Sequence, residues 1–96
     1  MIVRFLLPAR REFDDAVREY AAKRAGLGRE FSEAIAAAFV RINAYPDAWG
    51  LIGRNIRRYV ASRIPNAIIY RREAAEIVII AIAHHRREPN YWYSRQ

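Results

Sequence analysis

The feature that most constrains the fold is an apolar run of seven residues, Ile77 to Ala83, near the end of the 96-residue chain. Isoleucine and valine dominate it and polar residues bound it, so it predicts a β-strand buried on both faces, at the centre of a small sheet. His84, His85, Arg86 and Arg87 follow directly, and then the aromatic triplet of residues 91–93. The core strand is therefore expected to end in a cationic and aromatic edge.

Two helices are predicted before this strand. Ile2–Leu7 favours an opening strand, and Pro8 suits the first turn of a helix. Apolar residues then recur with helical spacing between Phe13 and Ala21, while Glu12, the other acidic residues of this stretch, Arg18 and Lys23 are assigned to its wet face. The first helix is expected to end near Ala25, where Gly26 and Gly28 permit a tight turn, and the second to run from about Phe31 and close before Pro46.

The rest of the chain predicts a small sheet. Residues 46–53 are expected to form a turn-rich crossover, with Trp49 plugging one end of the core. Residues 54–61 and 66–72 are expected to be strands, the first with one strongly basic face, and residues 73–76 a hairpin turn into the apolar strand. The predicted order is β-α-α-β-β-β, a single α+β domain over residues 1–96 in which a helical hairpin covers one face of the sheet.

The net charge of +7 is unevenly placed along the chain. Residues 1–49 hold eight Lys or Arg and seven Asp or Glu, whereas residues 50–96 hold nine and three. Sixteen of the seventeen cations are arginine, the side chain suited to planar contact with phosphate or carboxylate. The basic half predicts an anionic partner, either nucleic acid or an acidic polypeptide.

Several classes of site find no support in the sequence. The chain has no cysteine, so no disulfide or thiolate metal site is expected, which fits a cytoplasmic protein. His84 and His85 are adjacent on a strand and should point to opposite faces, so no metal site is predicted. No cofactor motif, signal peptide or membrane span is expected.

The strongest candidate site is a cationic and aromatic edge drawn from three segments of the expected sheet. It can bind single-stranded nucleic acid, or act as a metal-free ribonuclease in which arginine stabilises charge and Tyr or His moves a proton. Alternatively its aromatic rings pack the sheet, as is favoured for Trp49, Tyr59 and Tyr70, and its arginines meet a partner's carboxylates. The residues of this edge are Arg54, Arg57, Arg58, Arg63, Arg71, Arg72, Arg86, Arg87, Tyr59, Tyr70, Tyr91 and Trp92.

The C-terminal half resembles the RelE/ParE superfamily of type II toxin-antitoxin toxins, in particular its ParE-like branch, often labelled plasmid stabilisation proteins. The matching signals are Arg63 to Pro65 leading into residues 68–71, the strand Ile77 to Ala83, and the closing pattern H-x-R-R-x-P-x-Y-W from His84 to Trp92. This resemblance implies two antiparallel helices on a small antiparallel sheet. It also implies a cognate antitoxin whose small, acidic C-terminal tail wraps the toxin in a hetero-oligomer.

The resemblance implies two alternative activities. ParE-like members poison DNA gyrase by protein contact, and the residues expected to contact antitoxin or target are then Arg54, Arg57, Arg58, Arg63, Arg71, Arg86, Arg87 and Trp92. RelE-like members cut mRNA on translating ribosomes, and the candidate catalytic residues are then Arg58, Arg86, Tyr91 and Tyr93. Ala67 stands where RelE-like members keep an arginine, which favours the ParE-like alternative and a protein that is not an enzyme. A third interpretation is an RNA-binding module without toxicity.

Overall fold

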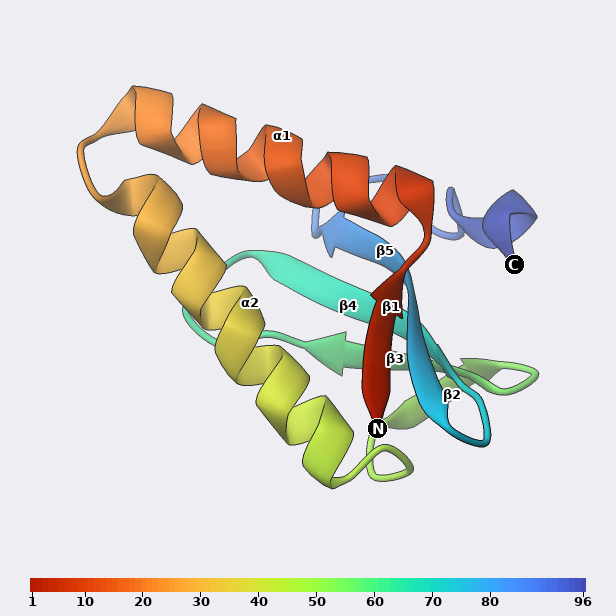
Figure 1. The fold of residues 1–96 in the computed structure, drawn as a ribbon. Coiled ribbons are helices and arrows are strands. Elements are labelled where there is room, and N and C mark those ends of the chain that lie inside the picture. The colour runs from red at the N-terminus through yellow and green to blue at the C-terminus, as the bar shows by residue number, and fades with distance from the viewer.

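A computed structural model describes residues 1–96 as a helical hairpin on one side of a twisted sheet, with the C-terminal segment on the other side (Figure 1). The predicted α+β class is confirmed. The elements, in chain order, are β1 (Ile2–Phe5), α1 (Leu7–Lys23), α2 (Leu27–Ala44), β2 (Gly50–Gly53), β3 (Ile56–Val60), β4 (Asn66–Arg72), β5 (Glu76–His84) and the 3-10 turn η1 (Tyr93–Arg95).

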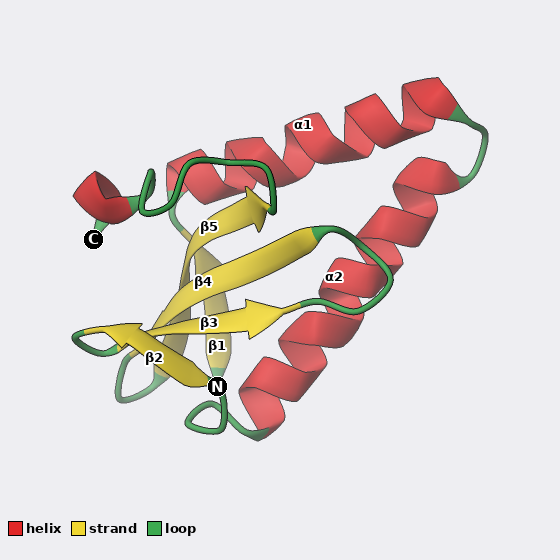
Figure 2. Cartoon of the chain, turned by 180° about the vertical axis from the view of Figure 1, so that it is seen from behind, coloured by secondary structure: helices red, strands yellow, loops and turns green.

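The sheet has five strands in the order β1-β5-β4-β3-β2. Figure 2 shows it from behind, with β5 and β4 side by side and β2 at one edge. The expectation of an antiparallel sheet is wrong for one pair, because β1 runs parallel to β5. These two strands lie at opposite ends of the chain, so no hairpin turn requires them to be antiparallel. Strand β4, rather than β5, lies in the middle of the order.

Strand β2 is the element that the sequence pattern missed. Gly50–Gly53 holds two glycines in four residues, a composition that disfavours strands, and its strand character comes from its pairing with β3. The strand expected from residue 54 begins only at Ile56, because Arg54 and Asn55 form the turn between β2 and β3 and Asn55 adopts a φ of 61°. The order is therefore β-α-α-β-β-β-β.

The helical hairpin depends on two glycines that act differently. Gly26 adopts a φ of 85° between the helices, as expected for the turn. Gly28 lies within α2, where a Cβ atom would stand 2.8 Å from the Val17 carbonyl oxygen. It therefore allows close approach of α1 and α2, a packing role that differs from the turn role assigned to it.

The core has two layers, one on each face of the sheet. Phe31, Ile35 and Ile42 of α2 pack with Ile77 and Ile79 of β5 on the helix side. A smaller cluster on the other face contains Ile56, Ile69, Ile80, Ala81 and Trp92. Strand β5 is buried on both faces, as predicted. Neither helix is both long and apolar enough to cross a membrane.

Candidate functional site

The nine cations of residues 50–96 fall into two groups according to whether a carboxylate lies within ion-pair distance. Four of them form ion pairs, and they are Arg57, Arg71, Arg72 and Arg95. The other five have no carboxylate partner in the structure, and they are Arg54, Arg58, Arg63, Arg86 and Arg87. The basic half is therefore only partly available to a partner.

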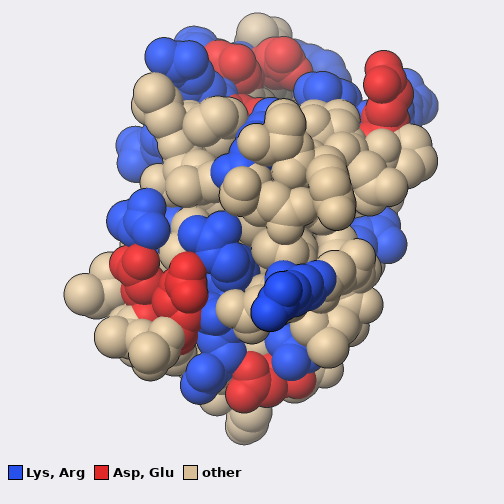
Figure 3. Space-filling model, turned by 90° about the vertical axis from the view of Figure 1, so that its right-hand side faces the viewer, with Lys and Arg blue, Asp and Glu red and all other residues tan.

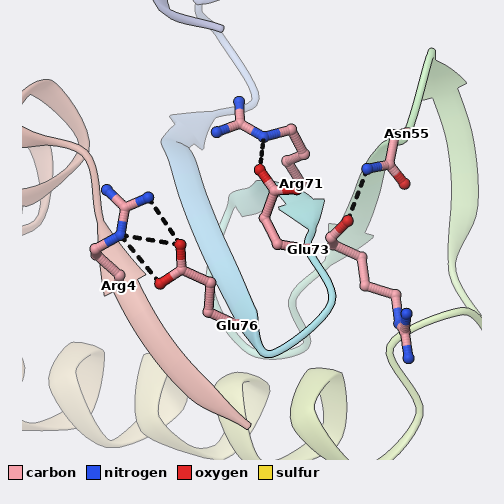
Figure 4. A network of polar contacts seen from close by, with 6 residues as sticks. Arg4, Asn55, Arg71, Glu73 and Glu76 are labelled. Carbon is pink, nitrogen blue, oxygen red and sulfur yellow. Dashed lines mark hydrogen bonds and ion pairs between the residues drawn. The ribbon is translucent and has the colours of Figure 1, made fainter.

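Three arginines with carboxylate partners, Arg4, Arg71 and Arg72, gather at the end of the sheet where the β4–β5 turn lies. Figure 4 shows Arg4 facing Glu76 and Arg71 facing Glu73, at N···O distances of 3.0 and 2.8 Å. The hydrogen bond from Arg4 lowers the pKa of the Glu76 carboxyl below its ordinary value. Arg72 contacts Asp47 at 3.1 Å. We call this set, Arg4, Arg71 and Arg72 with Glu76, Glu73 and Asp47, the paired end.

Arg57 and Arg58 lie side by side in β3 and point to opposite faces of the sheet. Arg57 Nη1 donates hydrogen bonds to the carbonyl oxygens of Trp49 and Asp47, at 2.7 and 3.0 Å. Trp49 in turn packs edge-on against Tyr59, with ring centroids 4.6 Å apart. Arg57 thus fastens the loop before β2 rather than facing solvent, whereas Arg58 is exposed. The expected strongly basic face is therefore divided between two faces.

A groove of about 320 Å³ lies between β3 and the C-terminal segment, on the face of the sheet away from α2. Arg58 lies on one wall, and His85 and Arg87 lie on the wall formed by the C-terminal segment. Arg86 is the neighbouring exposed cation. We call Arg58, Arg86 and Arg87 the unpaired end. The groove is lined by Ile52, Arg58, Ala67, Ile69, Ala83, His84, His85, Arg87, Glu88, Pro89, Asn90, Tyr91 and Trp92.

Basic side chains occur on the surface both beside acidic ones and apart from them. Figure 3 shows the side of the molecule that lies to the right in Figure 1, where most acidic side chains form small groups that touch basic ones. Other basic side chains on this side stand among neutral atoms. A cation in such neutral surroundings keeps its charge available for an anionic partner.

The two histidines shape the turn after β5. His84 Nδ1 accepts a hydrogen bond from the Arg86 backbone N–H at 3.0 Å. The His85 backbone N–H donates to the Pro65 carbonyl oxygen at 2.9 Å. These bonds turn the chain so that Arg86 and Arg87 lie beyond the strand.

The aromatic triplet is divided among three roles. Trp92, expected as a contact residue, is only 4% exposed and packs against Ile56, Ile69 and Ile80. The Tyr91 hydroxyl donates a 2.6 Å hydrogen bond to Glu12 Oε2, and burial together with this bond raises the pKa of Tyr91. Tyr93 is 64% exposed and does not line the groove. The four residues expected to act in RNA cleavage are therefore not gathered around one point.

Glu12 is a site residue that the sequence reasoning missed. It was assigned to the wet face of the first helix, but its side chain is only 17% exposed and accepts hydrogen bonds from Tyr91, Arg95 and the Ile82 backbone. A usable signal exists in the helical spacing, because Glu12 lies three residues after buried Ala9 and four before Ala16. That spacing places it at the margin of the buried stripe.

Arg63 lies away from the other unpaired cations. It adopts a φ of 69° in the loop between β3 and β4, a left-handed conformation that is uncommon for a side chain with a Cβ. It lines a second groove of about 620 Å³, between this loop and α2, together with Arg41 and the rings of Phe31 and Tyr59. Arg54 lies in the turn between β2 and β3, close to the paired end.

One comparison with known proteins identifies a family, and another supports the fold. Residues 3–89 match the family model for the ParE toxin of the type II toxin-antitoxin system parDE. The structure is similar to the solved chromosomal ParDE TA system from P. aeruginosa, with a TM-score of 0.62 at 14% identity, over 88% of this chain and 95% of that chain. That likeness concerns the fold, and no curated protein matches the sequence. Because the family model covers nearly the whole chain, this protein belongs to the ParE toxin family of type II toxin-antitoxin systems.

Proposed function

We propose that this toxin poisons DNA gyrase by protein contact in the cytoplasm and that a cognate antitoxin neutralises it. One observation carries the proposal: the exposed cations Arg58, Arg86 and Arg87 have no carboxylate partner within the molecule, beside a groove whose tyrosine hydroxyl is already bound to Glu12. Such a surface favours recognition of an anionic partner over bond cleavage. The toxin needs no chemistry of its own in this proposal.

Contact through these arginines has a physical basis. A guanidinium group offers five N–H donors in a rigid fork, which matches carboxylate geometry and is more weakly hydrated than ammonium. The groove beside the unpaired end supplies apolar surface from Ile52 and Ala83. A partner with carboxylates and apolar side chains can therefore contact both the guanidinium groups and the apolar surface of the groove. Neutralisation follows if the acidic antitoxin tail occupies the same cations and excludes the target.

A second candidate, ribosome-dependent mRNA cleavage, is favoured by a different observation. Arg58, His85 and Arg87 line one groove, and an imidazole in the same groove as two guanidinium groups can move a proton while the cations stabilise a phosphate. The bond between Tyr91 and Glu12 weighs against it, because the raised pKa of Tyr91 makes proton loss harder. Ala67, buried at the groove, supplies no cation.

Incubation of the purified protein with gyrase, ATP and supercoiled plasmid tests the proposal. After detergent and protease treatment, linear DNA that rises with the protein concentration and falls when antitoxin is added is the expected result. Absence of linear DNA, with supercoiling unchanged, contradicts gyrase poisoning. Codon-specific cleavage of mRNA on translating ribosomes, tested in parallel, would then support the second candidate.

A further inference from the structure

The C-terminal tail, residues 85–96, forms one wall of the groove but is not part of the sheet. Apart from the His85 bond to Pro65, its backbone hydrogen bonds are local, as in those from Arg87 to His84 and from Tyr93 to Asn90. Its position therefore depends on side chains. Trp92 anchors it through apolar packing, and a polar cluster around Glu12 of α1 provides a second anchor.

Glu12 lies beside β5, beyond the last β5 residue that pairs with β1. Strand β1 pairs with β5 only as far as Ile79, so the next backbone groups of β5 on that side lack a strand partner. Glu12 Oε1 accepts the Ile82 N–H at 3.1 Å, and Arg95 Nη1 donates to the Ile80 carbonyl oxygen at 3.2 Å. Glu12 and Arg95 also join each other, with N···O distances of 2.8 and 3.0 Å. The cluster is therefore fixed to the sheet.

Tyr91 links the cluster around Glu12 to Arg87, a cation of the unpaired end. Its hydroxyl is bound to Glu12 Oε2 at 2.6 Å, and the Arg87 guanidinium carbon lies 3.8 Å from the centroid of its ring. A guanidinium this close to an aromatic face is held by cation–π attraction. The orientation of the Tyr91 ring thus decides where the charge of Arg87 lies relative to the groove.

We propose that Glu12 is a positioning residue for Arg87: by holding the Tyr91 hydroxyl, it fixes the ring on which the Arg87 guanidinium stacks. The inference rests on the proposed function in taking Arg87 to be a contact residue. Glu12 itself touches no partner in this scheme. It acts through Tyr91, 79 positions away in the chain.

The first test measures the free toxin by NMR, with no target present. In the wild type, stacking over the Tyr91 ring should move the side-chain methylene protons of Arg87 upfield. Glu12→Gln should remove most of this shift, and Tyr91→Phe, which keeps the ion pair between Glu12 and Arg95, should reduce it. Glu33→Gln serves as the matched control, because Glu33 lies on α2, forms only an exposed ion pair with Arg29 and does not line the surface around Arg87 and Tyr91. An unchanged Arg87 shift in both Glu12→Gln and Tyr91→Phe overturns the proposal.

The second test separates positioning from a general loss of stability. Glu12→Gln should raise the toxin concentration for half-maximal gyrase poisoning about tenfold, whereas adding Glu12→Gln to Arg87→Ala should change it by no more than about twofold. A further tenfold loss in the double variant overturns the inference, because Glu12 would then act without Arg87. If wild-type toxin does not poison gyrase at all, the proposed function fails, and the NMR shift still decides whether Glu12 positions Arg87.

Discussion

Arginines lie at both ends of the sheet, but those at one end pair with carboxylates and those at the other do not. At the paired end, Arg4, Arg71 and Arg72 each contact a carboxylate. At the unpaired end, Arg58, Arg86 and Arg87 contact none. The carboxylates explain the difference, because Glu73 and Glu76 flank the β4–β5 turn, whereas Glu88 is the only acidic residue in the tail and the nearby Glu12 of α1 is already paired with Arg95. The supply of nearby carboxylates, rather than the number of arginines, divides the basic half into a structural end and a binding end.

Because of this difference, the uncompensated positive charge of the basic half lies mainly at the unpaired end. An ion pair within the molecule leaves little net field around it, whereas unpaired cations repel one another and attract an outside anion. The unpaired end also stands beside a groove whose one wall is the tail. The two ends, and the tail that forms this wall, are therefore expected to respond differently to substitution.

The largest expected effect is on the free energy of unfolding, and it follows removal of the tryptophan that anchors the tail beside the groove. Trp92→Ala should reduce the free energy of unfolding by about 3 to 5 kcal/mol, because it empties the centre of the smaller core cluster. Urea denaturation measures the loss. Tyr93→Ala, at the exposed neighbouring position, should stay within about 0.5 kcal/mol of wild type. Similar losses for both variants would show that the tail is not anchored through Trp92.

The next effect concerns antitoxin binding. Replacing Arg86 and Arg87 by alanine should weaken binding of the cognate antitoxin by about 1 to 3 kcal/mol for each residue that lies in the centre of the interface. Isothermal titration calorimetry measures the affinity, which should also fall as salt is added to wild-type toxin, since exposed charges are screened. Unchanged affinity at low salt would remove these cations from the antitoxin interface.

A smaller effect is expected at the paired end. Arg71→Ala should lower the free energy of unfolding by up to about 1 kcal/mol, the usual range for an ion pair near the surface. Urea denaturation in parallel with Arg86→Ala sharpens the comparison, because the exposed Arg86 side chain contacts neither a carboxylate nor an aromatic ring. A larger stability loss in Arg86→Ala than in Arg71→Ala would reverse the assignment of the two ends.

The smallest effect is a dependence of stability on pH at the paired end. The pKa of Glu76 is lower in the folded protein than its ordinary value, so its contribution is present above that ordinary value and is lost as pH falls through the lowered one. Unfolding free energies measured across the acidic range should therefore decline less steeply in Glu76→Gln than in wild type. Parallel curves would mean that the bond with Arg4 does not persist in solution.

Several parts of the fold could be predicted from local patterns. The run Ile77 to Ala83 indicates a doubly buried strand by composition alone, and the apolar spacing of both helices indicates which faces they bury. Strand β2 could not be found in this way, because Gly50–Gly53 becomes a strand only through pairing with β3. The parallel pairing of β1 likewise depends on where the two helices return the chain.

The candidate site was less predictable, because it depends on which side chains meet. Arg57 and Arg58 are adjacent and chemically identical, yet only Arg57 reaches the carbonyl oxygens of Asp47 and Trp49. Trp92 and Tyr91 belong to one aromatic triplet, yet one fills the core and the other binds Glu12. These outcomes follow from register and topology, which residue types alone do not encode.

The most direct test of the unpaired end as the binding surface compares the two ends of the sheet in one gyrase assay. Wild-type toxin, a variant of the paired end (Arg4→Ala with Arg71→Ala) and a variant of the unpaired end (Arg58→Ala, Arg86→Ala and Arg87→Ala) are titrated against gyrase, ATP and supercoiled plasmid. The paired-end variant should form linear DNA at nearly the wild-type concentration, and the unpaired-end variant should need at least about tenfold more. Equal potency of the two variants, or a loss of potency confined to the paired-end variant, would contradict the assignment of the unpaired end as the surface that binds gyrase.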